Sequence, residues 1–122
     1  MEIKKVLIID DEPLIVKSTG FALVYYGMAT LGANNGEKGL KMAETEKPDI
    51  ILLDIMMPGM DGWEVLSRLK DNPATHDIPV VVFTAKEYSN GPNLARSKGA
   101  VDYVAKPFEP EHLYQVLLRN LS

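Results

Sequence analysis

The sequence contains no cysteine. It therefore has no disulfide framework, no thiolate metal site and no thiol nucleophile, which fits a reducing compartment. It also lacks any run close to the ~20 apolar residues of a membrane span, and the apolar start of the chain meets acidic residues too early for a signal peptide. We expect a cytoplasmic protein that does not engage a membrane.

Clustered positive charge is missing as well. The formal net charge is −4, and the 13 Lys and Arg residues are scattered along the chain. Because a nucleic-acid binder usually gathers its basic residues on one stretch or face, direct binding to nucleic acid is not expected. The composition, 46% hydrophobic over 122 residues, is that of a globular protein. This length predicts one domain over residues 1–122.

Short apolar runs alternate with longer segments of helical period. The candidate strands are Val6–Ile9, Ala29–Ala33, Ile50–Leu53, Val80–Phe83 and Asp102–Ala105. The first, third and fourth are rich in Ile, Leu and Val without alternation, as in parallel strands covered on both faces. Strands that alternate with helices through short connections predict right-handed crossovers. The expected fold class is a doubly wound α/β domain with five βα units.

Helix boundaries carry their own signals. In the first helix, Pro13 suits the first turn, and Ile15, Ala22 and Tyr26 follow helical spacing up to a stop at Gly27. The other helices are expected from a capping box at Asn34 and Glu37 to about Glu46, from Asp61 to Asn72, from near Pro92 to Gly99, and from Pro110 to the terminus. The fourth would be short, because Gly and Pro interrupt its start.

Polar residues gather where the strands end. Strand one ends at Asp10 and Asp11, strand three at Asp54 and strand four at Thr84, while Lys106 follows strand five. Any one of them is explained as a helix cap, a strand-forming threonine or a solvated lysine. Independent caps, however, have no reason to fall at the same end of four strands. In doubly wound folds the ligand crevice lies at that end, so we expect these groups to converge there.

Three acidic side chains at one place oppose one another's ionisation and need a counterion. Oxygen ligands without His or Cys favour Mg²⁺, for which Mn²⁺ or Ca²⁺ could substitute. Mg²⁺ leaves room for phosphate oxygens, and a carboxylate can itself be the nucleophile that forms an aspartyl phosphate. Asp54, on the central strand, is the best candidate. Mg²⁺, Lys106 and Thr84 could each address one phosphoryl oxygen.

Four segments, IIDDEP, LLDIMMPGMDG, VVFTA and DYVAKPF, occur in this order along the chain. In sequence and spacing they resemble the receiver domain of two-component response regulators. The resemblance covers essentially the whole chain and implies the flavodoxin-like strand order 2-1-3-4-5. It also implies that Asp54 takes a phosphoryl group from a histidine kinase or a histidine phosphotransfer protein. Such a protein is no enzyme with an external substrate, since it catalyses only its own phosphorylation and dephosphorylation.

The same resemblance assigns metal ligands around Asp54. Asp11 and Asp54 would bind Mg²⁺ directly, the backbone carbonyl of Met56 would join them, and Asp10 would bind through water. Each of these groups offers oxygen, as Mg²⁺ requires.

Other residues would bind the phosphoryl group and respond to it. Thr84, the backbone amide of Ala85 and Lys106 would contact its oxygens, and Pro107 would follow a cis peptide bond. The phosphoryl group would draw the Thr84 hydroxyl inward and let Tyr103 rotate from exposed to buried. This movement would reshape the surface of helix four, strand five and helix five for a downstream effector.

Three alternatives remain open. An Mg²⁺-dependent phosphatase with an aspartyl intermediate needs a carboxylate two residues beyond its nucleophile; Met56 occupies that position after Asp54, although Glu12 occupies it after Asp10. A nucleotide or flavin binder needs a Gly-rich loop after strand one, where this chain has acids. A receiver-like module that is never phosphorylated is the third, because the break at residues 90–92 alters a surface that the family uses for partners. The protein would be a monomer or a phosphorylation-dependent dimer.

Overall fold

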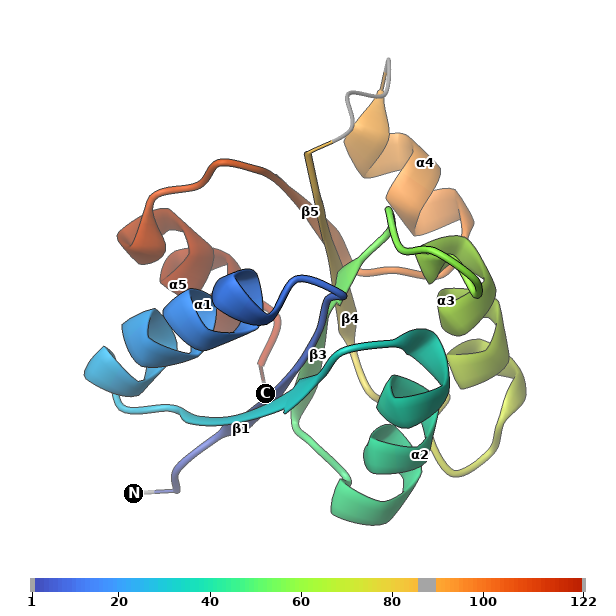
Figure 1. Cartoon of the computed structure of the whole chain (residues 1–122), viewed down its shortest axis with the longest axis horizontal. Coiled ribbons are helices and arrows are strands. Elements are labelled where there is room, and N and C mark those ends of the chain that lie inside the picture. The colour runs from blue at the N-terminus through green and yellow to red at the C-terminus, as the bar shows by residue number, and fades with distance from the viewer. Residues whose placement is uncertain (1, 86–89, 122) are drawn as a thin grey trace.

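The computed structural model describes residues 2–85 and 90–121. Its sheet has five parallel strands in the order β2-β1-β3-β4-β5 (Figure 1). The strands are β1 (Lys5–Ile9), β2 (Ala29–Ala33), β3 (Ile50–Asp54), β4 (Val80–Thr84) and β5 (Asp102–Ala105). The predicted fold class and strand order are confirmed. Three strands are one residue longer than the predicted ranges, and Asp54 and Thr84 are the last residues of β3 and β4.

Helices cover both faces of the sheet. They are α1 (Pro13–Tyr25), α2 (Gly36–Glu46), α3 (Gly62–Asp71), α4 (Gly91–Ser97) and α5 (Pro110–Arg119). Figure 1 shows α1 and α5 on one side and α2, α3 and α4 on the other. Each face has its own apolar cluster. The unalternated central strands β3 and β4 are buried along their whole length because side chains on both of their faces lie under helices.

The apolar positions predicted for α1 lie on its inner side. Ile15, Ala22 and Tyr26 are half-buried, and Thr19 and Leu23, at helical spacing from them, are fully buried. Ile15 packs against the apolar cluster that contains Leu23. The helix also carries apolar side chains on its outer face, where the exposed residues are Leu14, Phe21, Val24 and Tyr25. Because α1 is apolar almost all the way round, periodicity alone could not predict that these residues stay exposed.

The start of α2 lies one residue later than predicted. Asn35, not Asn34, is the N-cap, and its side-chain oxygen accepts a hydrogen bond from the Lys38 backbone N–H at 2.8 Å. The Asn34 side-chain oxygen instead accepts a hydrogen bond from the side-chain amide nitrogen of Asn35 at 3.3 Å. The predicted capping box with Glu37 is therefore wrong. Two adjacent Asn residues have similar capping propensity, so sequence could not choose between them.

The N-terminus of α3 packs directly against the carboxyl end of β3. Gly62 donates its backbone N–H to the Ile55 carbonyl at 3.0 Å. A Cβ atom at Gly62 would clash with the backbone oxygen of Asp54 and the Cα atom of Ile55. The absence of a side chain at Gly62 therefore lets α3 approach the strand end that carries Asp54.

We expect Gly62→Ala to lower the free energy of unfolding by about 2–3 kcal/mol, because backbone atoms cannot move aside as a side chain can. Urea denaturation measures the change. Gly20→Ala in α1 is the matched control: its Cβ would meet a side-chain atom, Thr30 Oγ1, at 3.3 Å. That variant should stay within about 1 kcal/mol of wild type, since alanine also favours the helix. Equal stability of the two variants would contradict the packing argument.

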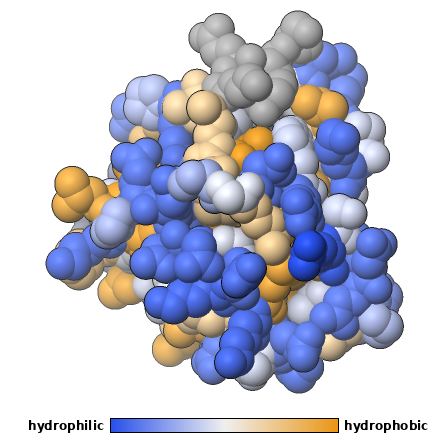
Figure 2. Space-filling view, turned by 45° about the vertical axis from the view of Figure 1, so that its right-hand side comes forward, coloured by the Kyte–Doolittle hydropathy of each residue, from blue (hydrophilic) through white to orange (hydrophobic). Residues whose placement is uncertain are grey.

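No helix in the described part of the chain has the length and apolar character to cross a membrane. The face drawn in Figure 2 is mostly hydrophilic, with apolar side chains between the polar ones.

Candidate functional site

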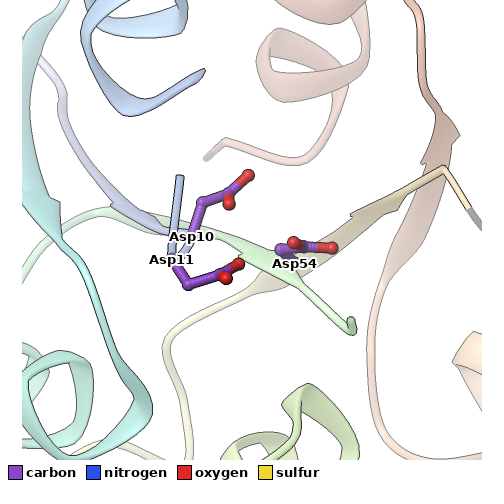
Figure 3. A group of neighbouring side chains, drawn as sticks. All are labelled: Asp10, Asp11 and Asp54. Atoms are coloured by element: carbon purple, nitrogen blue, oxygen red, sulfur yellow. The ribbon is translucent and has the colours of Figure 1, made fainter. Parts of the chain in front are cut away.

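The three predicted carboxylates lie together beyond the ends of β1 and β3 (Figure 3). Asp10 and Asp11 follow β1, and Asp54 ends the adjacent strand β3. One oxygen from each side chain lies within 4.8 Å of the others. The sequence placed these residues at the ends of separate strands, and the parallel sheet brings those ends to one edge.

Asp10 is held firmly. Its side chain is fully buried, and one carboxylate oxygen accepts from the Glu12 backbone N–H at 2.9 Å. The other oxygen accepts from the Lys106 ammonium at 2.7 Å. Asp11 is half-buried and more open than Asp10. The two neighbouring acids therefore have different surroundings.

Lys106 reaches both strand ends from β5. Its Nζ atom lies 2.7 Å from an Asp10 oxygen and 3.5 Å from an Asp54 oxygen. The same atom lies 4.4 Å from the centre of the Phe83 ring. The lysine is therefore the counter-charge of a buried acidic pair, not a solvated surface group.

Asp54 is the acid whose titration is most perturbed. Burial raises its pKa, and the negative charge of Asp10 raises it further. Lys106 and a hydrogen bond from the Met56 backbone N–H, at 3.2 Å, act in the opposite direction. The net result is a pKa of about 6, above the usual 3.8. Lys106 therefore does not fully offset the effects of burial and of the Asp10 charge on the pKa of Asp54.

The donor set fits a hard divalent cation. All three side chains offer carboxylate oxygens, and a second positive charge would oppose the burial and the Asp10 charge that together raise the pKa of Asp54. Asp11 is the most accessible of the three acids. Asp10 is already engaged by Lys106 and the Glu12 backbone N–H.

The remaining residues of the predicted site lie around this cluster. Thr84 ends β4 and is buried, and Ala85 follows it and is exposed. Met56 lies in the loop after β3 with 55% of its surface exposed. The Lys106–Pro107 peptide bond is cis.

Tyr103 is half-buried on β5, and its ring lies so near Gly91 that a Cβ atom at Gly91 would clash with it.

A cavity of about 500 Å³ adjoins the cluster. One wall is α1, with Ile15 and Ala22, and the other is the segment after β5, with Pro107 and Phe108; Lys106 also lines it. Ile15 and Ala22 therefore border this cavity, and Ile15 also packs against the apolar cluster under α1 and α5.

Sequence reasoning missed Phe83 as part of the site. The residue reads as the apolar end of a buried strand, and it is fully buried. Its register opposite Asp54 on the neighbouring strand was the available clue, but that pairing is known only once the strand order is known.

Comparison with known proteins decides the family. The family model described as the response regulator receiver domain matches residues 6–118. The chain belongs to this family. It is 34% identical to protein PilH of Pseudomonas aeruginosa over 113 residues, which covers 93% of each chain. It is 41% identical to the alkaline phosphatase synthesis transcriptional regulatory protein PhoP of Bacillus subtilis, covering 90% of this chain and 45% of that protein.

Solved structures agree with this assignment. The chemotaxis protein CheY4 of Vibrio cholerae superposes with a TM-score of 0.90 at 28% identity, covering 98% of this chain and 100% of that one. The N-terminal domain of a response regulator receiver protein from Methanoculleus marisnigri JR1 is 38% identical, with a TM-score of 0.79 over 99% and 98% of the two chains.

The chain is thus a receiver domain of two-component response regulators. Phosphorylation of an aspartate is standard for this family, and the acidic cluster fits such a site. Receiver domains are generally signalling modules rather than catalysts of an external reaction, and response regulators interact with histidine kinases and effectors. The chain spans about half the length of several curated relatives, such as PhoP, and nearly all of PilH.

Proposed function

We propose that Asp54 is the phosphoacceptor of this receiver domain and that a phosphohistidine of a histidine kinase or a histidine phosphotransfer protein is the donor. The observation that carries the proposal is the placement of Asp54 at the end of β3, 3.5 Å from the Lys106 ammonium and within the acidic cluster. A carboxylate nucleophile needs a positive environment for the oxygens of the incoming group.

In the proposed step, an oxygen of Asp54 attacks phosphorus while the bond from phosphorus to the histidine nitrogen breaks, and its electron pair leaves with the imidazole. Lys106 would pair with one phosphoryl oxygen, and Thr84 and the Ala85 backbone N–H would bind the others. Burial of Asp54 keeps bulk water away from the reacting carboxylate. The chain would thus catalyse only its own phosphorylation and dephosphorylation.

The residues proposed to hold Mg²⁺ are Asp11 and Asp54 directly, the Met56 carbonyl, and Asp10 through water. The engagement of Asp10 by Lys106 and the Glu12 backbone N–H supports this division, because it leaves Asp11 as the freer of the two acids. When bound, Mg²⁺ neutralises charge on the carboxylates and on the phosphoryl oxygens. Mn²⁺ or Ca²⁺ would occupy the same oxygen ligands.

The response would pass from Thr84 to Tyr103 and the surface of α4, β5 and α5. Thr84 and Tyr103 lie on adjacent strands, and Tyr103 packs against Gly91 at the start of α4. Phosphorylation shifts the population only if it favours one arrangement of this surface over the other. Each preference of about 1.4 kcal/mol changes that equilibrium tenfold.

The phosphatase alternative gains no support from the site. Asp10, the acid that has Glu12 two residues on, is fully buried and bound to Lys106. Both of its carboxylate oxygens already accept hydrogen bonds, from the Glu12 backbone N–H and from Lys106, so neither is available to attack an external substrate.

Labelling with a small acyl phosphate in the presence of Mg²⁺ tests the proposal. Intact mass should show one added phosphoryl group, and peptide mapping should place it on Asp54. Chelation of the metal with EDTA should prevent the labelling. A phosphoryl group on any other residue, or labelling that is indifferent to EDTA, would refute the assignment.

A further inference from the structure

The strand order separates Lys106 from its carboxylate partners. This lysine follows β5, whereas its carboxylate partners follow β1 and end β3. Strand β4 lies between β5 and β3, so the lysine side chain must pass across the end of β4 to reach Asp54 and Asp10. A β4 side chain on the same face of the sheet would therefore lie in contact with the lysine side chain.

That side chain is Phe83. It lies in register with Asp54 on one side and with Val104 on the other. Residues in register on parallel strands point to the same face of the sheet, and Phe83 and Val104 belong to the apolar cluster under α1 and α5. The ring therefore lies beneath the path from β5 to the acidic cluster.

The geometry of the ring and the ammonium is that of a cation–π contact. The Lys106 Nζ atom lies 4.4 Å from the centre of the Phe83 ring, well inside the ~6 Å limit for such contacts. Phe83 is fully buried, and the side chain of Lys106 has only 12% of its surface exposed, so water screens the contact weakly. The Phe108 ring lies 6.1 Å from the Phe83 ring, centre to centre, and is tilted relative to it.

We propose that Phe83 is a positioning residue for Lys106: its ring face holds the ammonium over the end of β4, where it can meet the phosphoryl group on Asp54. This inference rests on the proposed function. An aliphatic residue such as leucine would support only the methylene stem of the lysine. The ring also attracts the ammonium itself, and this attraction does not depend on the charge that the carboxylates carry at each stage.

The ring can be tested without changing the shape of the core. Replacing Phe83 by 4-fluoro, 3,5-difluoro and 3,4,5-trifluoro phenylalanine weakens the negative potential of the ring face stepwise and nearly preserves its volume. The rate of labelling by a small acyl phosphate at saturating Mg²⁺ should fall with each fluorine, to about fivefold below wild type for the last. The same rings placed at Phe108 should leave the rate unchanged.

A double-mutant cycle separates positioning from packing. Phe83→Leu should slow labelling about fivefold in the wild-type background but leave the residual rate of Lys106→Met unchanged. If Phe83→Leu lowers stability through lost packing alone, it should lower the midpoint of urea denaturation by a similar amount in the wild-type and Lys106→Met backgrounds. As a readout besides activity, the Lys106 ε-methylene protons should move downfield in the NMR spectrum of Phe83→Leu, since they lose the ring current.

The two proposals fail differently. If wild type is not labelled on Asp54, the proposed function is wrong. If wild type is labelled but the fluorinated rings at Phe83 leave the rate unchanged, or the same rings at Phe108 slow it equally, the positioning role of Phe83 is wrong. An equal loss of rate from Phe83→Leu in the Lys106→Met background would also overturn it.

Discussion

Asp54→Asn is expected to be more stable than wild type in the absence of metal while losing acyl-phosphate labelling completely. The loss follows if Asp54 is the nucleophile, since an amide cannot form the acyl phosphate. The gain follows from the site's electrostatics. Burial and the charge of Asp10 raise the pKa of Asp54 to about 6, so its ionised form is disfavoured in the folded protein.

The sign and the pH range of the gain follow from linkage. The pKa of Asp54 is raised above its usual 3.8, so between about pH 4 and pH 6 the folded state binds more protons than the unfolded state. The contribution of this group to stability therefore falls as the pH rises through that range. Above pH 7 the ionised Asp54 lowers the free energy of unfolding by about 3 kcal/mol at most, and we expect Asp54→Asn to recover about 2 kcal/mol of this loss.

Urea denaturation of both proteins with EDTA, at pH 8 and at pH 5, measures the difference. Asp54→Asn should be the more stable at pH 8, and the gap should narrow toward pH 5. Asp71→Asn, an exposed acid at the end of α3, is the matched control and should change little at either pH. An Asp54→Asn variant less stable than wild type at pH 8 would show that the acidic cluster is not repulsive.

Much of this site was predictable because its information is local. Each strand end is marked by a change from apolar to polar residues, and parallel strands with short crossovers must bring those ends to one edge. Asp10, Asp54 and Lys106 could therefore be grouped before their distances were known. The short apolar runs of β1, β3 and β4 predicted the strands of the parallel sheet for the same reason.

What sequence could not supply depends on contacts between elements. The exposure of the apolar residues on the outer face of α1 could not be predicted, because the helix is apolar on nearly every side. The choice of Asn35 over Asn34 depends on where the chain leaves β2. Predicting the contact of Phe83 with Lys106 requires both the strand order and the register. A phenylalanine in an apolar strand does not indicate such a contact by itself.

Lys106→Met should have the opposite effect on stability from Asp54→Asn. Methionine keeps most of the stem but removes the charge that lies 2.7 Å from the fully buried Asp10. Removing one partner of a buried ion pair leaves the other uncompensated, at a cost of about 3 kcal/mol. We expect that loss at pH 8 in EDTA. It should shrink as the pH falls, because protonation of Asp54, whose pKa Lys106 holds down, removes part of the repulsion.

Mg²⁺ gives the sharper test of the same site. Because the ammonium and a divalent cation are attracted to the same carboxylates, Lys106→Met should bind Mg²⁺ more tightly than wild type, and saturating Mg²⁺ should restore most of its stability. Lys98→Met, which removes an exposed lysine beside Trp63, is the control for charge alone. If Mg²⁺ stabilised this control as much as it stabilised Lys106→Met, the Lys106 ammonium would not compete with the cation for Asp10, Asp11 and Asp54.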